Sequence, residues 1–287
     1  MKKRLLISCS GGEHLGRSIA NRINASYSRI KSERFPDSEL RIKIPDVRGK
    51  EVYFIQSFYR TKDNDINDKL VELLFAAKTA RELKAKKIFL IAPYLAYLRE
   101  DKRFKKGESV NAKIISKLFA FFDKVYVVEP HLHRFKKFNE FFPNAVRIKL
   151  EKEISRYIQK KIKKDFLLVG PDKESEQWVG PVAKSLKTNH TILNKKRFHA
   201  RKVQVKGKRI SQDTAIIIDD IISTGQTLIE ASKLIKAKKI YFIGIHGIFS
   251  ENALKKLRKI GEVVVSNTIP SPFSKIDCSD AIARMIK

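Results

Sequence analysis

The sequence predicts an α/β fold in which mainly parallel sheets are flanked by helices, and three observations support this prediction. Short apolar runs rich in β-branched residues recur along the chain. Longer stretches with helical periodicity separate several of these runs. The runs are continuously apolar, as expected for strands that are covered on both faces of a parallel sheet.

The expected strands are the apolar runs at residues 5–9, 52–56, 88–92, 125–128, 166–169, 214–218, 240–245 and 263–265. The expected helices are the stretches with apolar residues three and four positions apart, at residues 66–83, 110–122, 176–186 and 227–235. In open parallel sheets, ligands bind at the carboxyl ends of strands. The turns that follow these strands are therefore the places to search for functional residues.

The length of 287 residues suits two domains of ordinary size. Pro143 and Asn144 interrupt the pattern after about four strand and helix units. We therefore expect an N-terminal domain at residues 1–145 and a C-terminal domain at residues 146–275. The two halves alternate in the same way but show no obvious repeat in their residues.

The net charge is unusual, because 61 Lys and Arg against 31 Asp and Glu give +30. Such a charge attracts nucleic acid or phosphorylated small molecules. The lysines are scattered, however, and form no basic tail or stripe interleaved with aromatic residues. Nucleic-acid binding is therefore the less favoured interpretation, and most of the charge is expected to be solvated surface.

The apolar runs are too short for a membrane span, which needs roughly 20 residues. The apolar part of the N-terminus is also too short for a signal peptide. Cys9 and Cys278 have no metal-binding or disulfide spacing and are expected to be buried or half-buried. We expect a cytoplasmic protein without a membrane partner.

The most informative segment is the strand and turn at residues 214–227. Two consecutive aspartates follow four apolar residues, and a turn of Ser, Thr and Gly then opens the predicted helix. Carboxylates can accept hydrogen bonds from neighbouring sugar hydroxyls, while backbone N–H groups and side-chain hydroxyls can bind phosphate. An ordinary strand end with a helix cap would not need two consecutive aspartates. The candidate residues for ribose 5-phosphate are Asp219, Asp220, Ser223, Thr224, Gly225 and Thr227.

Two other patterns resemble functional motifs less closely. Residues 11–18 nearly match the Walker A pattern, but Arg17 replaces its lysine, so an ordinary glycine-rich turn before a helix is favoured. His131 and His133 have the spacing of a metal-binding pair, but Pro130 indicates that the strand has already ended. For His133, a functional and a structural role are equally open.

The segment at 214–227 resembles the phosphoribosyl-diphosphate-binding loop of the type I phosphoribosyltransferase superfamily. Three further segments resemble the ribose-phosphate diphosphokinase family within it. Residues 35–39 (Phe-Pro-Asp-Ser-Glu) resemble the adenine loop, residues 93–113 the triphosphate segment, and residues 268–270 (Thr-Ile-Pro) the closing motif. These matches occur in order from end to end of the chain.

The resemblance implies two tandem phosphoribosyltransferase-like domains, the first binding ATP and the second binding ribose 5-phosphate. It also implies that a C-terminal helix within residues 276–287 packs back on the first domain. The expected reaction transfers the diphosphoryl group of ATP to the C1 hydroxyl of ribose 5-phosphate, with Mg²⁺ as cofactor. A homodimer or higher homo-oligomer is expected, with the adenine pocket shared across a subunit contact.

The resemblance also assigns roles to matching residues. Phe35 would stack on adenine, and Asp37 and Glu39 would read its edge. The residues that would bind the rest of Mg²⁺-ATP are Arg99, Glu100, Asp101 and His131.

Three more residues match the family pattern outside the nucleotide segments. Asp172 would bind metal, as would His131, and would also contact the sugar. Lys195 and Arg197 match a catalytic Lys-x-Arg pair on a mobile loop that closes over the transferring group.

The chain departs from the commoner family pattern at several positions. Ser38 stands where Gly is usual, Glu100 replaces Gln, and Gln226 replaces Gly. These departures raise an alternative, a non-catalytic regulatory homologue that binds nucleotide or sugar phosphate. A salvage phosphoribosyltransferase is a third interpretation, but it would leave the adenine and triphosphate segments unexplained.

Overall fold

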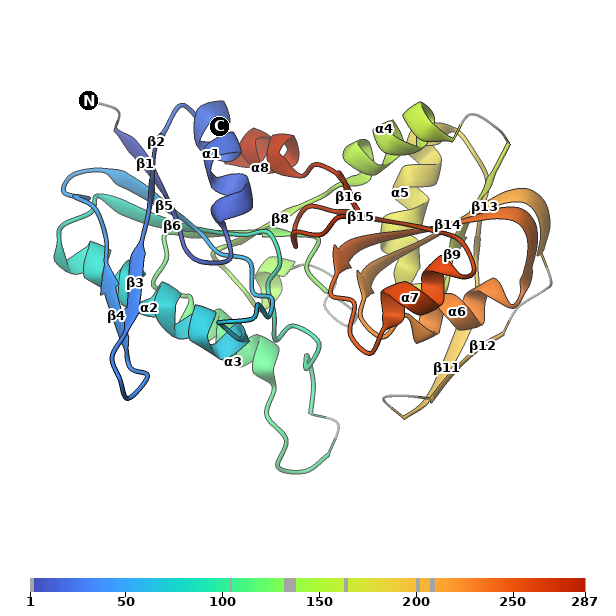
Figure 1. Ribbon diagram of the computed structural model, residues 1–287, viewed down its shortest axis with the longest axis horizontal. Coiled ribbons are helices and arrows are strands. Elements are labelled where there is room, and N and C mark those ends of the chain that lie inside the picture. Colours follow the sequence, from blue (N-terminus) through green and yellow to red (C-terminus); the bar gives the residue numbers. More distant parts are fainter. Residues whose placement is uncertain are drawn as a thin grey trace. The chain divides into compact units, whose positions relative to one another are not determined.

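The computed structural model describes residues 3–103, 105–131, 138–162, 165–199, 202–206 and 210–286, with the side chains of 195–199, 202–204 and 206 outside that description. The chain divides into two compact units (Figure 1). Unit 1 comprises Met1–Ile148 together with Ser279–Lys287, and unit 2 comprises Lys149–Cys278. Each unit contains a parallel sheet with helices packed against it, so the predicted α/β class is confirmed.

Unit 1 is built on a six-stranded sheet with the order β2-β1-β5-β6-β7-β8, in which every neighbouring pair is parallel. Its inner strands are continuously buried because both of their faces are covered, as their apolar runs predict. The strands are β1 (Arg4–Ser8), β2 (Ser26–Arg29), β5 (Glu51–Ile55), β6 (Lys87–Ala92), β7 (Lys124–Val128) and β8 (Ala145–Ile148).

The helices of unit 1 are α1 (Glu13–Arg22), α2 (Ile66–Glu82), α3 (Asn111–Leu118), the 3₁₀ turn η1 (Phe138–Glu140) and α8 (Ser279–Ile286). The C-terminal helix α8 lies beside α1 (Figure 1). Arg22 of α1 forms an ion pair with Asp280 of α8. Of the helices that the structure describes, none has the length and apolar character to cross a membrane.

Unit 2 contains a second six-stranded parallel sheet with the order β10-β9-β13-β14-β15-β16. Its strands are β9 (Leu167–Gly170), β10 (His190–Ile192), β13 (Ile210–Ile222), β14 (Ile235–Gly247), β15 (Glu262–Ser266) and β16 (Ser274–Ile276). Its helices are α4 (Glu151–Lys161), the 3₁₀ turn η2 (Lys173–Ser175), α5 (Glu176–Leu186), α6 (Gln226–Ser232) and α7 (Ala253–Arg258).

The two sheets have the same strand order when the strands are numbered within each unit. By position, β1 of unit 1 corresponds to β9 of unit 2, and β5 corresponds to β13. The turns that follow these strands can therefore be compared directly between the units.

Each unit also carries an antiparallel hairpin outside its main sheet. In unit 1, β3 (Lys31–Arg34) pairs with β4 (Leu40–Lys43). In unit 2, β11 (Asn194–His199) pairs with β12 (Lys202–Lys206). Both hairpins contain residues that the sequence marks as candidates for binding or catalysis.

Several predicted boundaries were wrong. The strand expected at 214–218 extends to Ile222, so Asp219 and Asp220 lie within β13 and do not follow it. Ile235 begins β14, although the sequence predicts a helix through this residue. The reason for both differences is the long pairing between β13 and β14. It begins where Ile210 pairs with Ile235 and ends where Ile222 pairs with Gly247. The helix expected at 110–122 ends earlier, at Leu118.

Candidate functional site

The strongest candidates in unit 2 are the two aspartates near the end of β13. Asp219 is 9% exposed and Asp220 is 4% exposed. The backbone N–H of Asp220 donates to Oδ1 of Asp219 at 3.0 Å, which fixes the first carboxylate against the second residue. Two consecutive carboxylates are seldom both buried without a functional reason, because burial of a charge is costly. This pair can accept hydrogen bonds from two neighbouring hydroxyls of a sugar.

The loop after β13 has the shape of an anion-binding turn. Gly225 has φ +74°, in the left-handed region that glycine adopts without strain. A side chain here would also crowd Leu257, whose Cδ1 lies 3.1 Å from an ideal Cβ. The hydroxyls of Ser223 and Ser250 form a hydrogen bond of 3.0 Å. The side-chain amide of Gln226 donates to the Glu230 carboxylate, also in α6, at 2.8 Å. The departure at Gln226 is thus accommodated on the helix, and the loop keeps its tight turn.

The corresponding helix in unit 1 begins differently. Asp65 caps α2, and its carboxylate accepts hydrogen bonds from the N–H groups of Asn67 and Asp68 at 2.6 and 2.9 Å. In unit 2, Gly225 precedes α6 and makes no side-chain cap hydrogen bond. The first N–H groups of α2 are therefore capped by a carboxylate of the protein, whereas in unit 2 the N–H of Gln226 donates to the Thr224 hydroxyl at 3.5 Å and no carboxylate caps α6. This difference favours unit 2 as the unit that binds a phosphate, in the turn after β13.

A second turn of unit 2 carries Asp172, directly after β9. Its side chain is buried and accepts a hydrogen bond from the N–H of Ser175 at 3.1 Å. Gly170 lies against this turn, since an ideal Cβ there would come within 2.2 Å of Ser175 Oγ. The close approach holds the Asp172 turn against the end of the strand. Asp172 therefore lies in the turn two residues after the end of β9, and its role in binding metal and sugar stays a prediction.

The turn after β1, which nearly matches Walker A, is occupied by the protein's own side chains. Glu72 accepts hydrogen bonds from the Ser10 N–H at 3.1 Å and from the Ser10 hydroxyl at 2.8 Å. Gln56 Oε1 accepts from the N–H of Gly11 at 2.7 Å. The buried ammonium of Lys69 lies 4.5 Å from the Tyr59 ring centre, and burial lowers the pKa of Lys69. These contacts support the interpretation of residues 11–18 as a structural turn.

The candidate adenine residues form the tip of the β3–β4 hairpin. Phe35 is 49% exposed, and its N–H donates to the Glu39 carbonyl at 2.9 Å. Asp37 Oδ1 accepts from the N–H of Glu39 at 3.1 Å. Ser38 has φ +76°, the conformation that the glycine usual at this position adopts readily. Ser38 thus adopts in this chain a conformation that glycine would adopt with less strain.

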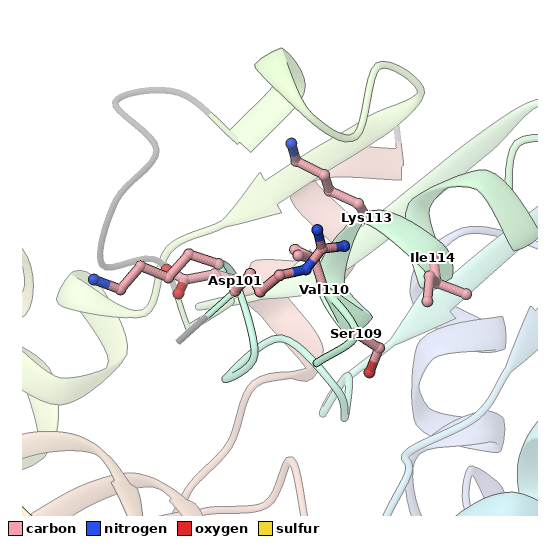
Figure 2. A pocket seen from close by; sticks show the side chains of 7 residues that line it. Asp101, Ser109, Val110, Lys113 and Ile114 are labelled. Atoms are coloured by element: carbon pink, nitrogen blue, oxygen red, sulfur yellow. The ribbon is translucent and has the colours of Figure 1, made fainter. Parts of the chain in front are cut away.

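The predicted triphosphate segment borders a pocket of about 600 Å³ in unit 1. Figure 2 shows side chains from the loop and from the start of α3 gathered around it. The lining residues are Asp101, Lys102, Arg103, Ser109, Val110, Lys113 and Ile114. Three cations against one carboxylate make the pocket suitable for a polyanion such as a triphosphate.

Sequence reasoning placed Arg99 and Glu100 with Asp101 at this site, but only Asp101 lines the pocket. Arg99 and Glu100 precede it and are exposed, and the Glu100 carbonyl accepts from the N–H of Ala112 at 3.2 Å. The cations Lys102, Arg103 and Lys113 belong to the predicted triphosphate segment, but the sequence assigned them no individual roles. The signal that could have identified them is their occurrence at both ends of the loop between β6 and α3.

His131 follows β7 by three residues and is partly buried. The segment before it is anchored by Glu129, whose carboxylate pairs with the guanidinium of Arg147 at 2.7 Å. Glu129 has φ +34°, so the chain turns sharply at the end of the strand. His131 is therefore held at a strand end, as its sequence context predicts. His133 lies outside the described residues.

Lys195 and Arg197 lie in strand β11, where Lys195 pairs with Val205 and Arg197 with Val203. Their backbone thus forms one arm of a hairpin, with a register shift immediately after Arg197. The side chains of both residues lie outside the described part of the structure, and their catalytic role remains a prediction.

The closing motif has a structural place in unit 2. Thr268 is fully buried, and its hydroxyl meets Nδ1 of the buried His246 at 2.9 Å. The Ser266 hydroxyl donates to Thr268 Oγ1 at 3.0 Å. This network joins the ends of β14 and β15, next to the end of β13, and therefore supports the strand that carries the two aspartates.

The chain matches two protein-family models that lie one after the other. Residues 4–121 match the N-terminal domain of ribose phosphate pyrophosphokinase. Residues 171–285 match the phosphoribosyl synthetase-associated domain.

Relatives of known name match over nearly the whole chain. A ribose-phosphate pyrophosphokinase of Pyrococcus furiosus is 32% identical over 98% of this chain and 100% of its own length. One from Sulfolobus acidocaldarius is 34% identical, and 96% of each chain is covered. The crystal structure of phosphoribosylpyrophosphate synthetase from Mycobacterium smegmatis superposes with a TM-score of 0.84 at 24% identity, covering 99% of this chain and 98% of that chain.

Proposed function

The chain belongs to the ribose-phosphate pyrophosphokinase family, and on that premise we propose that it transfers the diphosphoryl group of ATP to ribose 5-phosphate. The products are phosphoribosyl diphosphate and AMP. The full-length relatives at 32% and 34% identity support an enzyme over the regulatory homologue. The structural observation that carries the proposal is the buried pair Asp219 and Asp220 beside an anion-binding turn.

In this proposal, unit 2 binds ribose 5-phosphate. The carboxylates of Asp219 and Asp220 accept hydrogen bonds from the two ring hydroxyls, which are neighbours on the sugar. The 5-phosphate binds in the turn after β13, whose backbone N–H groups and side-chain hydroxyls are suitable donors for a phosphate. The residues of this turn are Ser223, Thr224, Gly225 and Thr227.

Unit 1 is proposed to bind the nucleotide. Phe35 stacks on adenine, while Asp37 and Glu39 accept hydrogen bonds from its edge. Arg99 holds the triphosphate together with the cations of the pocket, and Asp101 and Glu100 belong to the same segment. Phe35 is half exposed at a hairpin tip, which is consistent with an adenine pocket completed by a second copy of the chain in a homodimer or higher oligomer.

The proposed chemistry is a displacement at phosphorus. The C1 hydroxyl oxygen of ribose 5-phosphate attacks the β-phosphorus of ATP and loses its proton. The bond from the β-phosphorus to the oxygen of the α-phosphate breaks, and AMP leaves. Such a reaction depends on positioning and on stabilisation of negative charge more than on a covalent protein nucleophile. Lys195 and Arg197 are proposed to supply that stabilisation.

Mg²⁺ is the proposed cofactor, since the family uses a nucleotide whose phosphates bind this ion. Among the described residues, no group of three potential ligand side chains lies together. Mg²⁺ is usually held by one or two carboxylates together with substrate phosphates, so the oxygen of Asp172 suits it as a ligand. His131, also a candidate, suits contact with a phosphate better, because imidazole prefers softer metals. When bound, Mg²⁺ would neutralise charge on the phosphates.

The test of the proposed function is the fate of ATP labelled with ³²P at the α, β or γ position. Diphosphoryl transfer places the β and γ labels in the sugar product and the α label in AMP. Transfer of a single phosphoryl group would place only the γ label in the sugar product and would release ADP. Absence of any labelled sugar product from folded protein would contradict the proposal.

The negative charge of Glu100 is expected to weaken the binding of ATP. Replacing Glu100 with Gln removes an exposed negative charge next to the pocket for the triphosphate. The KM for ATP should therefore fall by about two- to fivefold, because exposed charges interact weakly. Steady-state rates at several ATP concentrations would measure this change. Glu82→Gln, at the far end of α2, is the control and should leave the KM unchanged; a rise in KM for Glu100→Gln would show that the carboxylate assists binding.

A further inference from the structure

The guanidinium of Arg34 holds the tip of the β3–β4 hairpin in its turned conformation. Arg34 is the last residue of β3 and immediately precedes Phe35. Its NH1 group donates to the carbonyl of Ser38 at 3.0 Å. Ser38 has φ +76°, which costs a residue with a side chain some free energy. The hydrogen bond spans the tip and offsets that cost.

The other edge of the same guanidinium is fixed to the first turn of α2. Its NH2 group donates to Asn64 Oδ1 at 3.0 Å and pairs with Asp68 Oδ1 at 3.0 Å. Asp68 is itself held, because its Oδ2 accepts from the N–H of Asp65 at 2.9 Å. This backbone hydrogen bond and the Arg34 guanidinium lower the pKa of Asp68, which keeps it charged at neutral pH.

The same turn of α2 also holds the segment proposed to bind the triphosphate. The Tyr97 hydroxyl donates a hydrogen bond to Oδ1 of Asn67. Tyr97 has φ +67°, an uncommon conformation for an aromatic residue, and it lies two positions before Arg99. Asn67 and Asp68 are neighbours, so one turn of helix contacts both nucleotide segments of the chain.

We infer that Arg34 is a positioning residue for adenine binding and that the start of α2 together with the two residues before it, residues 64–68, is the common anchor of the adenine hairpin and the triphosphate segment. This inference rests on the proposed function. The adenine residues are exposed at a hairpin tip, so without the anchor they would have to be ordered when the nucleotide binds. Ordering of side chains on binding weakens affinity, and preorganisation avoids that cost.

A purely structural role for Arg34 makes a different prediction. The ion pair between Arg34 and Asp68 is partly exposed, with 36% and 31% of the side chains accessible. Exposed ion pairs contribute little to the stability of the fold. If that were their only role, replacing Arg34 would change neither the KM for ATP nor the discrimination between ATP and GTP.

The experiment compares Arg34→Met, Arg34→Lys and Tyr97→Phe with Arg41→Met. Arg41 lies in the same hairpin and pairs with Glu33 at 3.8 Å, with both side chains about two-thirds exposed. For each variant, kcat and the KM values for ATP, GTP and ribose 5-phosphate are measured. The dissociation constant of α,β-methylene-ATP, which cannot transfer its diphosphoryl group, is measured in parallel.

Arg34→Met should raise the KM for ATP about tenfold, with kcat and the KM for ribose 5-phosphate nearly unchanged, and should reduce the preference for ATP over GTP. The KM of Arg34→Lys for ATP should lie between those of Arg34→Met and the wild type. The single ammonium of lysine cannot contact Ser38 and Asp68 at the same time, as the two arms of the guanidinium do. Tyr97→Phe should raise the KM values for ATP and GTP by about the same factor. Arg41→Met should resemble the wild type.

Equal effects of Arg34→Met and Arg41→Met on the KM for ATP would overturn the inference. A loss in kcat with no change in the KM would also overturn it. If the wild type made no phosphoribosyl diphosphate, the proposed function would fail separately. The affinities for α,β-methylene-ATP would then still show whether Arg34 positions the hairpin for adenine.

Discussion

Replacing Lys195 or Arg197 with alanine is expected to lower kcat for phosphoribosyl diphosphate formation by about a thousandfold. As AMP departs, the electron pair of the breaking bond goes to the leaving oxygen, so negative charge builds on that oxygen. A cation placed at the transferring group stabilises this charge more in the transition state than in bound ATP. The two residues alternate with Lys196 in strand β11, on a hairpin that extends from unit 2 (Figure 1).

The measurement separates turnover from binding. The kcat of each variant is compared with its dissociation constant for α,β-methylene-ATP, which should change by no more than about threefold if the cations act mainly in the transition state. Lys196→Ala, between the two, is the matched control and should retain most of the activity. Unchanged turnover in both Lys195→Ala and Arg197→Ala would refute the roles assigned to this pair.

Replacing Asp219 or Asp220 with asparagine is expected to raise the KM for ribose 5-phosphate by about 10- to 100-fold. Asparagine keeps the size of the side chain but replaces a charged acceptor with a weaker, neutral one. The two carboxylates are buried, at 9% and 4% exposure, so water does not screen their hydrogen bonds to a sugar strongly. Binding of ATP to unit 1 should be nearly unaffected.

The control for these variants lies in the same strand. Asp213 is in the first part of β13 and forms an exposed ion pair with Lys238 at 3.0 Å. Asp213→Asn should leave the KM for ribose 5-phosphate unchanged, and thermal unfolding would show whether each variant is folded. If Asp219→Asn and Asp220→Asn bound ribose 5-phosphate as tightly as the wild type, the sugar site would lie elsewhere.

The central strands of both sheets were predictable because they are buried on both faces and their residues are continuously apolar. The edge strand β2 and the hairpin strands β3 and β4 were not among the expected strands. Their sequences, Ser-Tyr-Ser-Arg, Lys-Ser-Glu-Arg and Leu-Arg-Ile-Lys, are largely polar and exposed. No continuous apolar run marks such strands, because β2 pairs on one side only, with β1, and the hairpin strands β3 and β4 lie outside the main sheet.

The candidate site could be predicted where a motif and a strand end coincide, as for Asp172 and the turn at Gly225. The cations that line the pocket and the anchor formed by Arg34 could not. Arg34 contacts Ser38, Asn64 and Asp68, and only the fold brings the last two near it. In a chain with 61 Lys and Arg, composition does not distinguish such a residue from a solvated one.

A chromatographic assay of the purified protein with Mg²⁺, ATP and ribose 5-phosphate tests the proposed reaction directly. We expect phosphoribosyl diphosphate and AMP to form in equal amounts, and only when both substrates are present. Folded protein that binds ATP but forms neither product would refute the proposed reaction and would favour a regulatory homologue, in which Glu100 is the first residue to replace.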